Sequence, residues 1–174
     1  MSETAMAPEK SQAGPHDLTV AEVERLFVDE AALLDAWDFD AWLDMLTDDV
    51  RYMVPATTSP DADHRNSVFF ISDDSRTLRS RANQLQRMSA WSENPRSRTR
   101  RLVTNFRILE ASETEATVTA NFAVWRFQYE VTDVFVGRYD YVLARTPAGL
   151  KIKTRRATLD MDTLRPHGKL SFIL

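Results

Sequence analysis

Residues 99–127 read TRRLVTNFRILEASETEATVTANFAVWRF, and this stretch decides the fold because its hydrophobic period is two. Such alternation is typical of half-buried strands, and it predicts strands over Thr99–Leu109 and Glu115–Phe127. The same period continues over Val134–Thr146 and Leu150–Asp160. The segments between these strands are short enough to join antiparallel neighbours, so we expect a meander of four long strands.

A helical period comes before this meander. Thr19 and Glu22 form a capping box, and apolar residues at helical spacing predict a first helix over residues 20–36. Its apolar positions are Val20, Val23, Phe27, Ala31 and Leu34. The other face carries acidic residues, which we assign to the surface: Glu22, Asp29, Glu30 and Asp35.

A short helix and a strand are expected after the first helix. A short second helix is predicted over Phe39–Leu46, with Asp38 or Asp40 as its N-cap. The polar residues 47–49 indicate a turn, and alternation over residues 50–54 predicts a strand that Pro55 ends.

The next segment combines a loop, an apolar run and a third helix. Residues 57–66 have the composition of a loop, and the run Val68–Ile71 predicts a buried strand or a brief extended segment. The third helix begins after one of three candidate caps and ends before Asn94-Pro95. The caps are Asp73, Asp74 and Ser75, and the apolar face is Leu78, Ala82, Leu85 and Met88.

Helices followed by long strands indicate an α+β domain, with the helices packed on one face of a curved antiparallel sheet. We expect a single domain over residues 18–174 and a disordered lead-in over residues 1–17, which is polar and has no periodicity. The tail ends in LSFIL, residues 170–174. Because apolar side chains avoid water, this tail is expected to be buried against its own sheet or against another subunit.

The composition excludes several classes of site. The chain has no cysteine, which excludes disulfides, thiolate nucleophiles and cysteine-ligated iron–sulfur clusters. Its four glycines are scattered, so there is no phosphate-binding glycine loop. No apolar run approaches the ~20 residues of a membrane span, and the N-terminus lacks the apolar core of a signal peptide. We therefore expect a cytoplasmic protein that does not enter a membrane.

Charge is distributed unevenly along the chain. Residues 75–107 contain nine arginines, no lysine and one acid, Glu93, which gives this segment a charge of +8. The whole chain has a net charge of −4, so the remainder carries −12. Arginine binds carboxylates with two parallel hydrogen bonds, and we expect this basic band to contact carboxylates of its own chain or of a partner subunit. The pI near 5.4 argues against nucleic acid as that partner.

The histidines do not form a recognisable metal site. His16 lies in the lead-in, His64 in a loop and His167 in the tail. A non-haem iron site needs two histidines and a carboxylate brought to one face. We therefore interpret the three as isolated surface residues and expect no metal and no cofactor in this chain.

The sequence contains candidate residues for acid–base chemistry in a pocket, but structural roles also explain why these residues are present. The candidates are Asp29, Asp35, Asp38 and Asp40 with Tyr52, Tyr139 and Tyr141. Two of these acids stand at cap positions, and the tyrosines alternate as sheet residues do. Five aromatic residues have two interpretations: they line an apolar ligand cavity, or they belong to the hydrophobic core. They are Trp91, Phe122, Trp125, Phe127 and Phe135. A free-standing isomerase or dehydratase and a hydrophobic-ligand-binding module therefore remain alternatives.

Three motifs stand in order along most of the chain. The first is EAALLD at residues 30–35 with FDAWL at 39–43 and DDVRY at 48–52. The second is SAWSENPRSRTRRLVTN at residues 89–105, and the third is FVGRY at 135–139 with the closing LSFIL. Together they resemble the small (β) subunit of Rieske-type aromatic-ring-hydroxylating dioxygenases. The segment Pro166-His-Gly168 departs from the family pattern.

The resemblance implies a cone-shaped fold like that of nuclear transport factor 2 and ketosteroid isomerase. It also implies self-association as a trimer within a hexamer of three large and three small subunits. In that family the large (α) subunit carries a Rieske 2Fe–2S cluster and a mononuclear non-haem iron, and electrons arrive from NAD(P)H through a reductase and often a ferredoxin. The small subunit is mainly architectural, so the resemblance implies no catalytic residue in this chain.

The arginines connect the resemblance with the strand pattern. Along a strand, Arg98 and Arg100 point to one face and Arg101 to the other. We expect the first two to bridge subunits and Arg101 to serve its own sheet. The residues predicted at a subunit interface are Arg98, Arg100, Trp91, Phe172 and Leu174.

Overall fold

The computed structural model describes residues 18–61, 63, 67–87, 93–162 and 170–174. In chain order the elements are α1 (Val20–Ala36), α2 (Phe39–Asp44), β1 (Leu46–Pro55), β2 (Phe69–Asp74), α3 (Ser75–Gln86), β3 (Arg98–Ala111), β4 (Glu115–Gln128), β5 (Val131–Thr146) and β6 (Gly149–Leu159). The expected lead-in of residues 1–17 and the histidines at 16, 64 and 167 lie outside the described residues.

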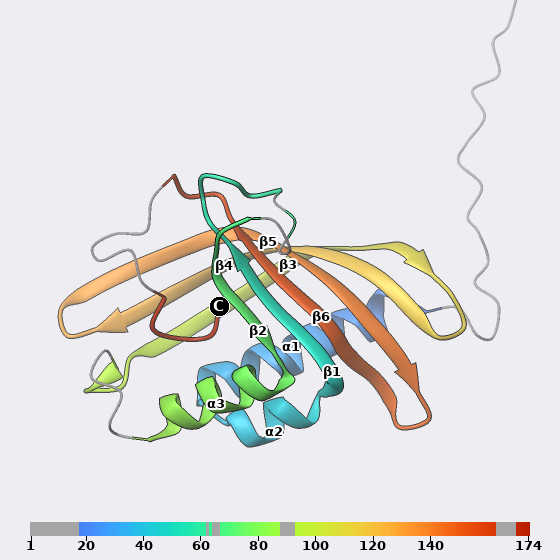
Figure 1. The fold of residues 1–174 in the computed structure, drawn as a ribbon, viewed down its shortest axis with the longest axis horizontal. Helices are drawn as coiled ribbons and strands as arrows, with labels where there is room; N and C mark the ends of the chain where they lie inside the picture. The colour runs from blue at the N-terminus through green and yellow to red at the C-terminus, as the bar shows by residue number, and fades with distance from the viewer. Residues whose placement is uncertain (1–17, 62, 64–66, 88–92, 163–169) are drawn as a thin grey trace, which may run out of the picture.

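The six strands form one sheet in the order β2-β1-β6-β5-β4-β3 (Figure 1). The predicted meander is confirmed, because β3, β4, β5 and β6 pair antiparallel with their neighbours in sequence. The predicted curved antiparallel sheet is confirmed, with one parallel pairing, that of β1 with β6. Periodicity within a strand does not report which distant strand lies beside it, so the sequence left this pairing undetermined.

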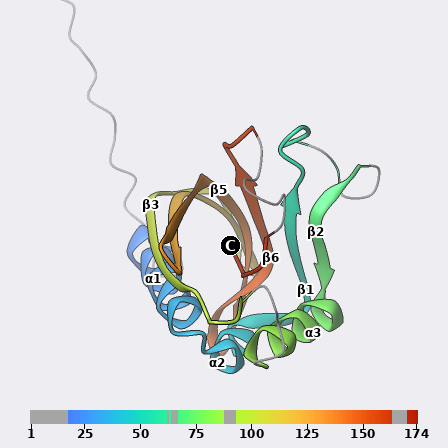
Figure 2. The ribbon, with the colours of Figure 1, turned by 90° about the vertical axis from the view of Figure 1, so that its left-hand side faces the viewer.

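The sheet is strongly curved, and its two faces differ. Figure 2 shows the strands curling around an interior, with the helices along one side and the C-terminal residues inside the curve. We call the buried side the inner face, where Arg101, Val124 and Phe135 are neighbours across β3, β4 and β5. The opposite side is the outer face. The helices and the inner face together enclose the hydrophobic core.

Helix starts follow the predicted caps. Thr19 and Glu22 form the capping box of α1, and the Asp38 side chain accepts a hydrogen bond from Ala41 N at the start of α2. Asp74 is the N-cap of α3 and forms a capping box with Thr77. In α1 the predicted Val23, Phe27 and Leu34 are buried, but Val20 is exposed.

Two predicted boundaries were wrong. The second helix ends at Asp44, and residues 46–49 belong to β1 instead of a helix end and a turn. The reason is tertiary pairing: Leu46 lies beside Ile152, whose amide donates to Met45 O at 2.9 Å. The third helix ends at Gln86 because Arg87 has an extended backbone, and the predicted core position Met88 lies outside the described residues.

Candidate functional site

The first candidate site is a charged cluster inside the curved sheet. Glu30 of α1 and Arg155 of β6 are both almost completely buried and form an ion pair, with Arg155 Nε 2.8 Å from Glu30 Oε1. The same carboxylate oxygen accepts a hydrogen bond from Trp42 Nε1 at 3.0 Å. The second oxygen accepts one from the Tyr141 hydroxyl at 2.6 Å. Three donors from α2, β5 and β6 thus converge on one carboxylate.

Three tyrosines surround the guanidinium of Arg155. Its central carbon lies 4.6 Å from the ring centroid of Tyr139, 5.4 Å from that of Tyr52 and 5.7 Å from that of Tyr141. Burial raises the pKa of all three phenols, most strongly that of Tyr141. Burial also lowers the pKa of Arg155, but the charge of Glu30 and the tyrosines outweigh it, and the net shift is upward. The arginine stays charged and the tyrosines stay neutral.

The hydrogen bonds and the ion pair of Glu30 connect α1 with α2, β5 and β6, so this cluster stabilises the fold. Both oxygens of Glu30 accept hydrogen bonds from side chains of their own chain, and Glu30 is only 3% exposed. Of the acids proposed for pocket chemistry, Asp35 is paired with Arg101 and Asp38 caps α2, while Asp29 and Asp40 are exposed. The structure therefore brings the predicted tyrosines together, but none of the predicted acids with them.

Sequence reasoning missed Glu30 as the acid that meets these tyrosines. We had assigned Glu30 to the exposed acidic face of α1, and the structure buries it. A signal was present: Glu30 lies three residues after Phe27 and four before Leu34, which places it on the apolar stripe. Arg155 likewise alternates with the inward-facing Ala157 and Leu159.

A second pair of buried charges uses the basic band. Arg101 Nη1 lies 2.5 Å from Asp35 Oδ1, and the Arg101 backbone amide donates to Asp35 Oδ2 at 3.0 Å. Thr99 donates its hydroxyl to the same carboxylate at 2.8 Å. The predicted alternation of the arginines is confirmed, since Arg101 faces the core while Arg98 and Arg100 are exposed. That Arg98 and Arg100 bridge subunits stays a prediction.

The second candidate site is the outer face of β3, β4 and β5. Strand register places Leu102, Ala123 and Val136 in one row, and Arg100, Trp125 and Val134 in the next. Arg98 and Phe127 extend the same surface. We call these eight residues the outer-face patch: Arg98, Arg100, Leu102, Ala123, Trp125, Phe127, Val134 and Val136.

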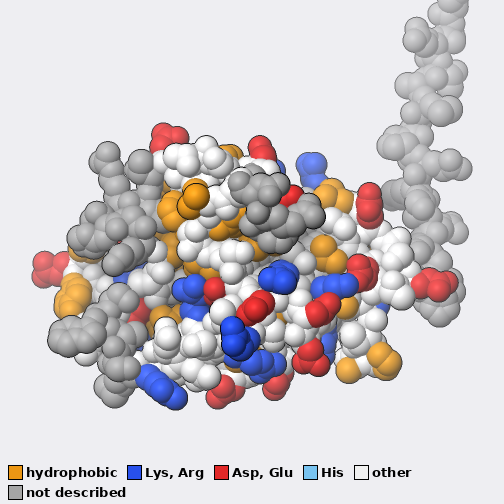
Figure 3. All heavy atoms as spheres, viewed as in Figure 1, with side chains coloured by type: hydrophobic (Ala, Val, Ile, Leu, Met, Phe, Trp, Pro, Cys, Tyr) orange, Lys and Arg blue, Asp and Glu red, His pale blue; other side chains and the backbone are white. Residues whose placement is uncertain are grey.

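The outer-face patch combines exposed apolar side chains with unused positive charge. Leu102 is 53% exposed and Val136 is 44% exposed. Within the described part of the chain, the side chains of Arg98 and Arg100 have no hydrogen-bond or ion-pair partner. An apolar sheet surface bordered by free guanidinium groups is typical of a protein–protein contact. Figure 3 shows another side of the molecule, where acidic and basic side chains are interspersed.

The remaining predicted interface residues have different positions. Phe172 and Leu174 are buried within their own chain, so the structure resolves the two alternatives for the tail in favour of its own sheet. Their predicted contact with another subunit stays a prediction. Trp91 lies outside the described residues. Of the aromatic residues considered for a cavity, Phe122 and Phe135 are core, whereas Trp125 and Phe127 belong to the outer-face patch.

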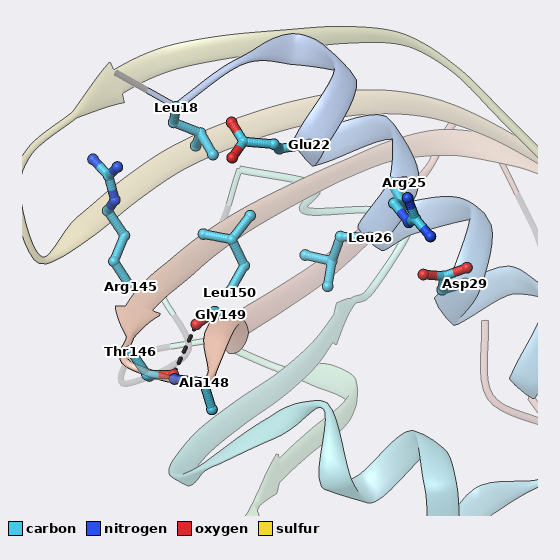
Figure 4. Close-up of a pocket in the computed structure, with 10 residues that line it drawn as sticks. All are labelled: Leu18, Glu22, Arg25, Leu26, Asp29, Arg145, Thr146, Ala148, Gly149 and Leu150. Atoms are coloured by element: carbon cyan, nitrogen blue, oxygen red, sulfur yellow. Dashed lines mark hydrogen bonds between the residues drawn. The ribbon is translucent and has the colours of Figure 1, made fainter. Parts of the chain in front are cut away.

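A groove of about 540 Å³ lies between the start of α1 and the turn that joins β5 to β6 (Figure 4). Leucines at positions 18, 26 and 150 provide its apolar part, and charges of both signs line the rest. The carboxylate of Glu22 is already held by the amide and hydroxyl of Thr19, which lower its pKa.

The described residues contain neither a candidate metal site nor a candidate membrane-spanning helix. No cluster of three metal-ligating side chains occurs there. No helix in the same part of the chain is long and apolar enough to cross a membrane.

Comparison with known proteins identifies close relatives in sequence. A family model described as "Ring hydroxylating beta subunit" matches residues 29–166. The small oxygenase component of the p-cumate 2,3-dioxygenase system of Pseudomonas putida is 43% identical over 158 residues, which cover 90% of this chain and 88% of the relative. The β subunit of biphenyl 2,3-dioxygenase from Rhodococcus jostii is 30% identical over 162 residues, covering 87% and 86% of the two chains.

Solved structures share the fold at lower identity. A naphthalene 1,2-dioxygenase structure matches with a TM-score of 0.74 and 21% identity, covering 88% of this chain and 84% of the other. The β subunit of benzoate 1,2-dioxygenase from Burkholderia mallei matches with a TM-score of 0.72 and 21% identity, covering 88% and 99%. A putative scytalone dehydratase from Novosphingobium aromaticivorans has a TM-score of 0.60 at 16% identity, covering 86% and 90%. The fold alone is therefore compatible with both a subunit and an enzyme.

Proposed function

Since this chain belongs to the β-subunit family of ring-hydroxylating dioxygenases, we propose that it is the architectural subunit that trimerises and positions iron-containing α subunits. As a family member it is part of an oxidoreductase that acts on aromatic rings. The identities of 30–43% over most of the chain favour this function over a free-standing isomerase, dehydratase or ligand-binding module.

The proposed complex contains three α and three β subunits in the cytoplasm. Its Rieske cluster and mononuclear iron belong to the α subunit, and NAD(P)H supplies electrons through a reductase, with or without a ferredoxin. Oxygen then adds to the aromatic ring as a cis-dihydrodiol. The printed name of the relative, a small oxygenase component, supports an oxygenase built from more than one kind of chain. The absence of cysteine from the sequence agrees with a cluster held elsewhere.

The observation that carries the proposal is the outer-face patch. A sheet face with exposed Leu102, Val134 and Val136 is costly in water, since each apolar side chain gains roughly 1.5–3 kcal/mol when it is fully buried. Arg98 and Arg100 stand beside these residues with their guanidinium groups unpaired among the described residues. We propose that this surface, together with Trp91, contacts neighbouring subunits. Phe172 and Leu174, which were also predicted at the interface, are buried within their own chain and lie behind this surface instead of on it.

The test is a double substitution, Arg98→Ala with Arg100→Ala, in the β subunit produced together with its α subunit. Truncating one partner of a desolvated ion pair costs about 2–5 kcal/mol, so the yield of hexamer should fall steeply. Native mass spectrometry measures that yield, and circular dichroism checks that the sheet is retained.

The matched control is Arg76→Ala with Arg79→Ala. This pair removes two exposed arginines from α3, away from the outer-face patch, and should leave the hexamer yield unchanged. A normal yield from the Arg98/Arg100 variant would contradict the proposed interface.

A further inference from the structure

The last three residues are buried in the interior of the curved sheet, and Leu170 and Ser171 before them are half-buried. Phe172, Ile173 and Leu174 are 3%, 1% and 0% exposed. The Phe172 ring packs edge-on against Phe135 of β5, with the ring centroids 5.2 Å apart. The Arg101 guanidinium lies over the same ring, 5.8 Å from its centroid. The segment thus buries an aromatic ring in a site built from two strands.

Polar contacts to the segment go largely to its main chain. Arg101 Nη2 donates a hydrogen bond to Ile173 O, and Leu174 N donates to the Tyr52 hydroxyl at 3.1 Å. A third contact joins Ser171 Oγ to Glu93 Oε1 at 2.5 Å. Main-chain carbonyl and amide groups are common to all peptides, so two of these three contacts would form with any peptide that fits the site.

The three residues that make polar contacts with the segment also interact with other parts of the fold. Arg101 is fixed by Asp35 and Thr99. Glu93 accepts hydrogen bonds from Arg126 Nη2 at 2.9 Å and from Ser97 N at 3.0 Å. The Tyr52 ring lies beside the guanidinium of Arg155, which Glu30 fixes in turn. The binding site therefore does not depend on the segment for its own geometry, and preorganised sites bind at low entropic cost.

We propose that the interior of the curved sheet is a peptide-binding site, and that residues 170–174 are its built-in ligand. The ligand class is a short peptide with an aromatic residue followed by two branched aliphatic residues. Phe172 supplies the ring that packs on Phe135, and the main chain supplies the acceptor for Arg101 and the donor for Tyr52. This site is distinct from the outer-face patch and does not depend on the proposed function.

The test separates the ligand from the site. A chain that lacks residues 170–174 is mixed with the synthetic peptide Leu-Ser-Phe-Ile-Leu, and binding is measured by calorimetry together with the thermal midpoint. We expect saturable one-to-one binding and a higher midpoint. The control peptide replaces Phe172 by Ala and should bind roughly tenfold more weakly or worse, because it lacks the buried ring.

A second measurement covers the case in which the shortened chain does not fold. A full-length chain with a protease site introduced between residues 163 and 169 is folded, cut and passed through a desalting column, and a labelled copy of the peptide is then added. Retention of the freed segment, or its exchange for the labelled peptide, supports the site. Loss of the segment without rebinding of the labelled peptide overturns the proposal, as does a folded shortened chain that shows no binding.

Discussion

Glu30 accepts hydrogen bonds from three elements that are far apart in the sequence. Trp42 lies 12 residues away, Tyr141 lies 111 residues away and Arg155 lies 125 residues away. One buried carboxylate thus connects α1 with α2, β5 and β6. A buried ion pair gives little net stability compared with apolar residues of similar volume, but removing one partner leaves an uncompensated charge in the core.

The first prediction follows from this asymmetry. Glu30→Ala should lower the free energy of unfolding by about 3–5 kcal/mol, because Arg155 is left buried without its partner. The double variant Glu30→Leu with Arg155→Met should recover part of that loss, although Trp42 and Tyr141 still lack their acceptor. Guanidinium denaturation measures both. A double variant less stable than Glu30→Ala would contradict this view of the pair.

The buried tyrosines predict a loss of stability at alkaline pH. Burial raises the pKa of Tyr52, Tyr139 and Tyr141 above the ordinary value of 10.0. A raised pKa of an acid in the folded state means that its neutral form stabilises the fold. This contribution is fully present below pH 10.0 and is lost as the pH rises from there towards the folded-state pKa.

Two measurements check the alkaline prediction. The thermal midpoint should fall above pH 10.0, and phenolate absorbance should appear together with unfolding instead of before it. Complete titration of Tyr52, Tyr139 and Tyr141 in the folded chain would contradict the prediction.

At the level of elements, β5 depends on a close approach at Gly137. This residue lies between Phe122 on β4 and Leu159 on β6. A Cβ atom built at Gly137 would lie 2.0 Å from Thr158 O, which no side chain can occupy. Gly137 belongs to the motif FVGRY. The close packing of β5 against β6 therefore explains why this position of the motif is a glycine.

Substitutions of Gly137 and Gly149 should lower stability by two different mechanisms. Gly137→Ala should destabilise by about 3 kcal/mol or more, because β5 and β6 must move apart. Gly149→Ala meets no atom within 4 Å but has a φ of +113°, so it should cost roughly 1 kcal/mol from backbone strain. Guanidinium denaturation of both variants checks the order. Equal losses would show that steric contact at β5 does not decide stability.

At the level of the whole molecule, the outer-face patch and the buried cluster have separate roles. The cluster holds helices and strands together inside one chain, whereas the patch presents apolar side chains and arginines to the outside. We expect the chain purified without an α subunit to contain no stoichiometric iron, and the co-purified complex to contain it. Metal analysis together with native mass checks both expectations. Stoichiometric iron in the isolated chain, or turnover of an aromatic substrate by it, would contradict the architectural function.

The sequence by itself determined the features that local patterns encode. Alternation predicted the four-stranded meander, and the capping box at Thr19 marked the start of the first helix. For the other two helices the sequence offered two and three candidate caps, among which the structure uses Asp38 and Asp74. It also predicted that Arg101 faces the core while Arg98 and Arg100 face outward, because side chains alternate along a strand. The ordered motifs indicated the family that the model over residues 29–166 identifies.

Only the tertiary structure decided what depends on distant segments. The burial of Glu30 requires Arg155 and Tyr141 to arrive beside it, and the parallel pairing of β1 with β6 joins strands about one hundred residues apart. The site of Phe172 likewise exists once β1, β3 and β5 have assembled around it. Periodicity and capping act over a few residues, whereas the partner of a buried charge is chosen by the packing of the whole chain.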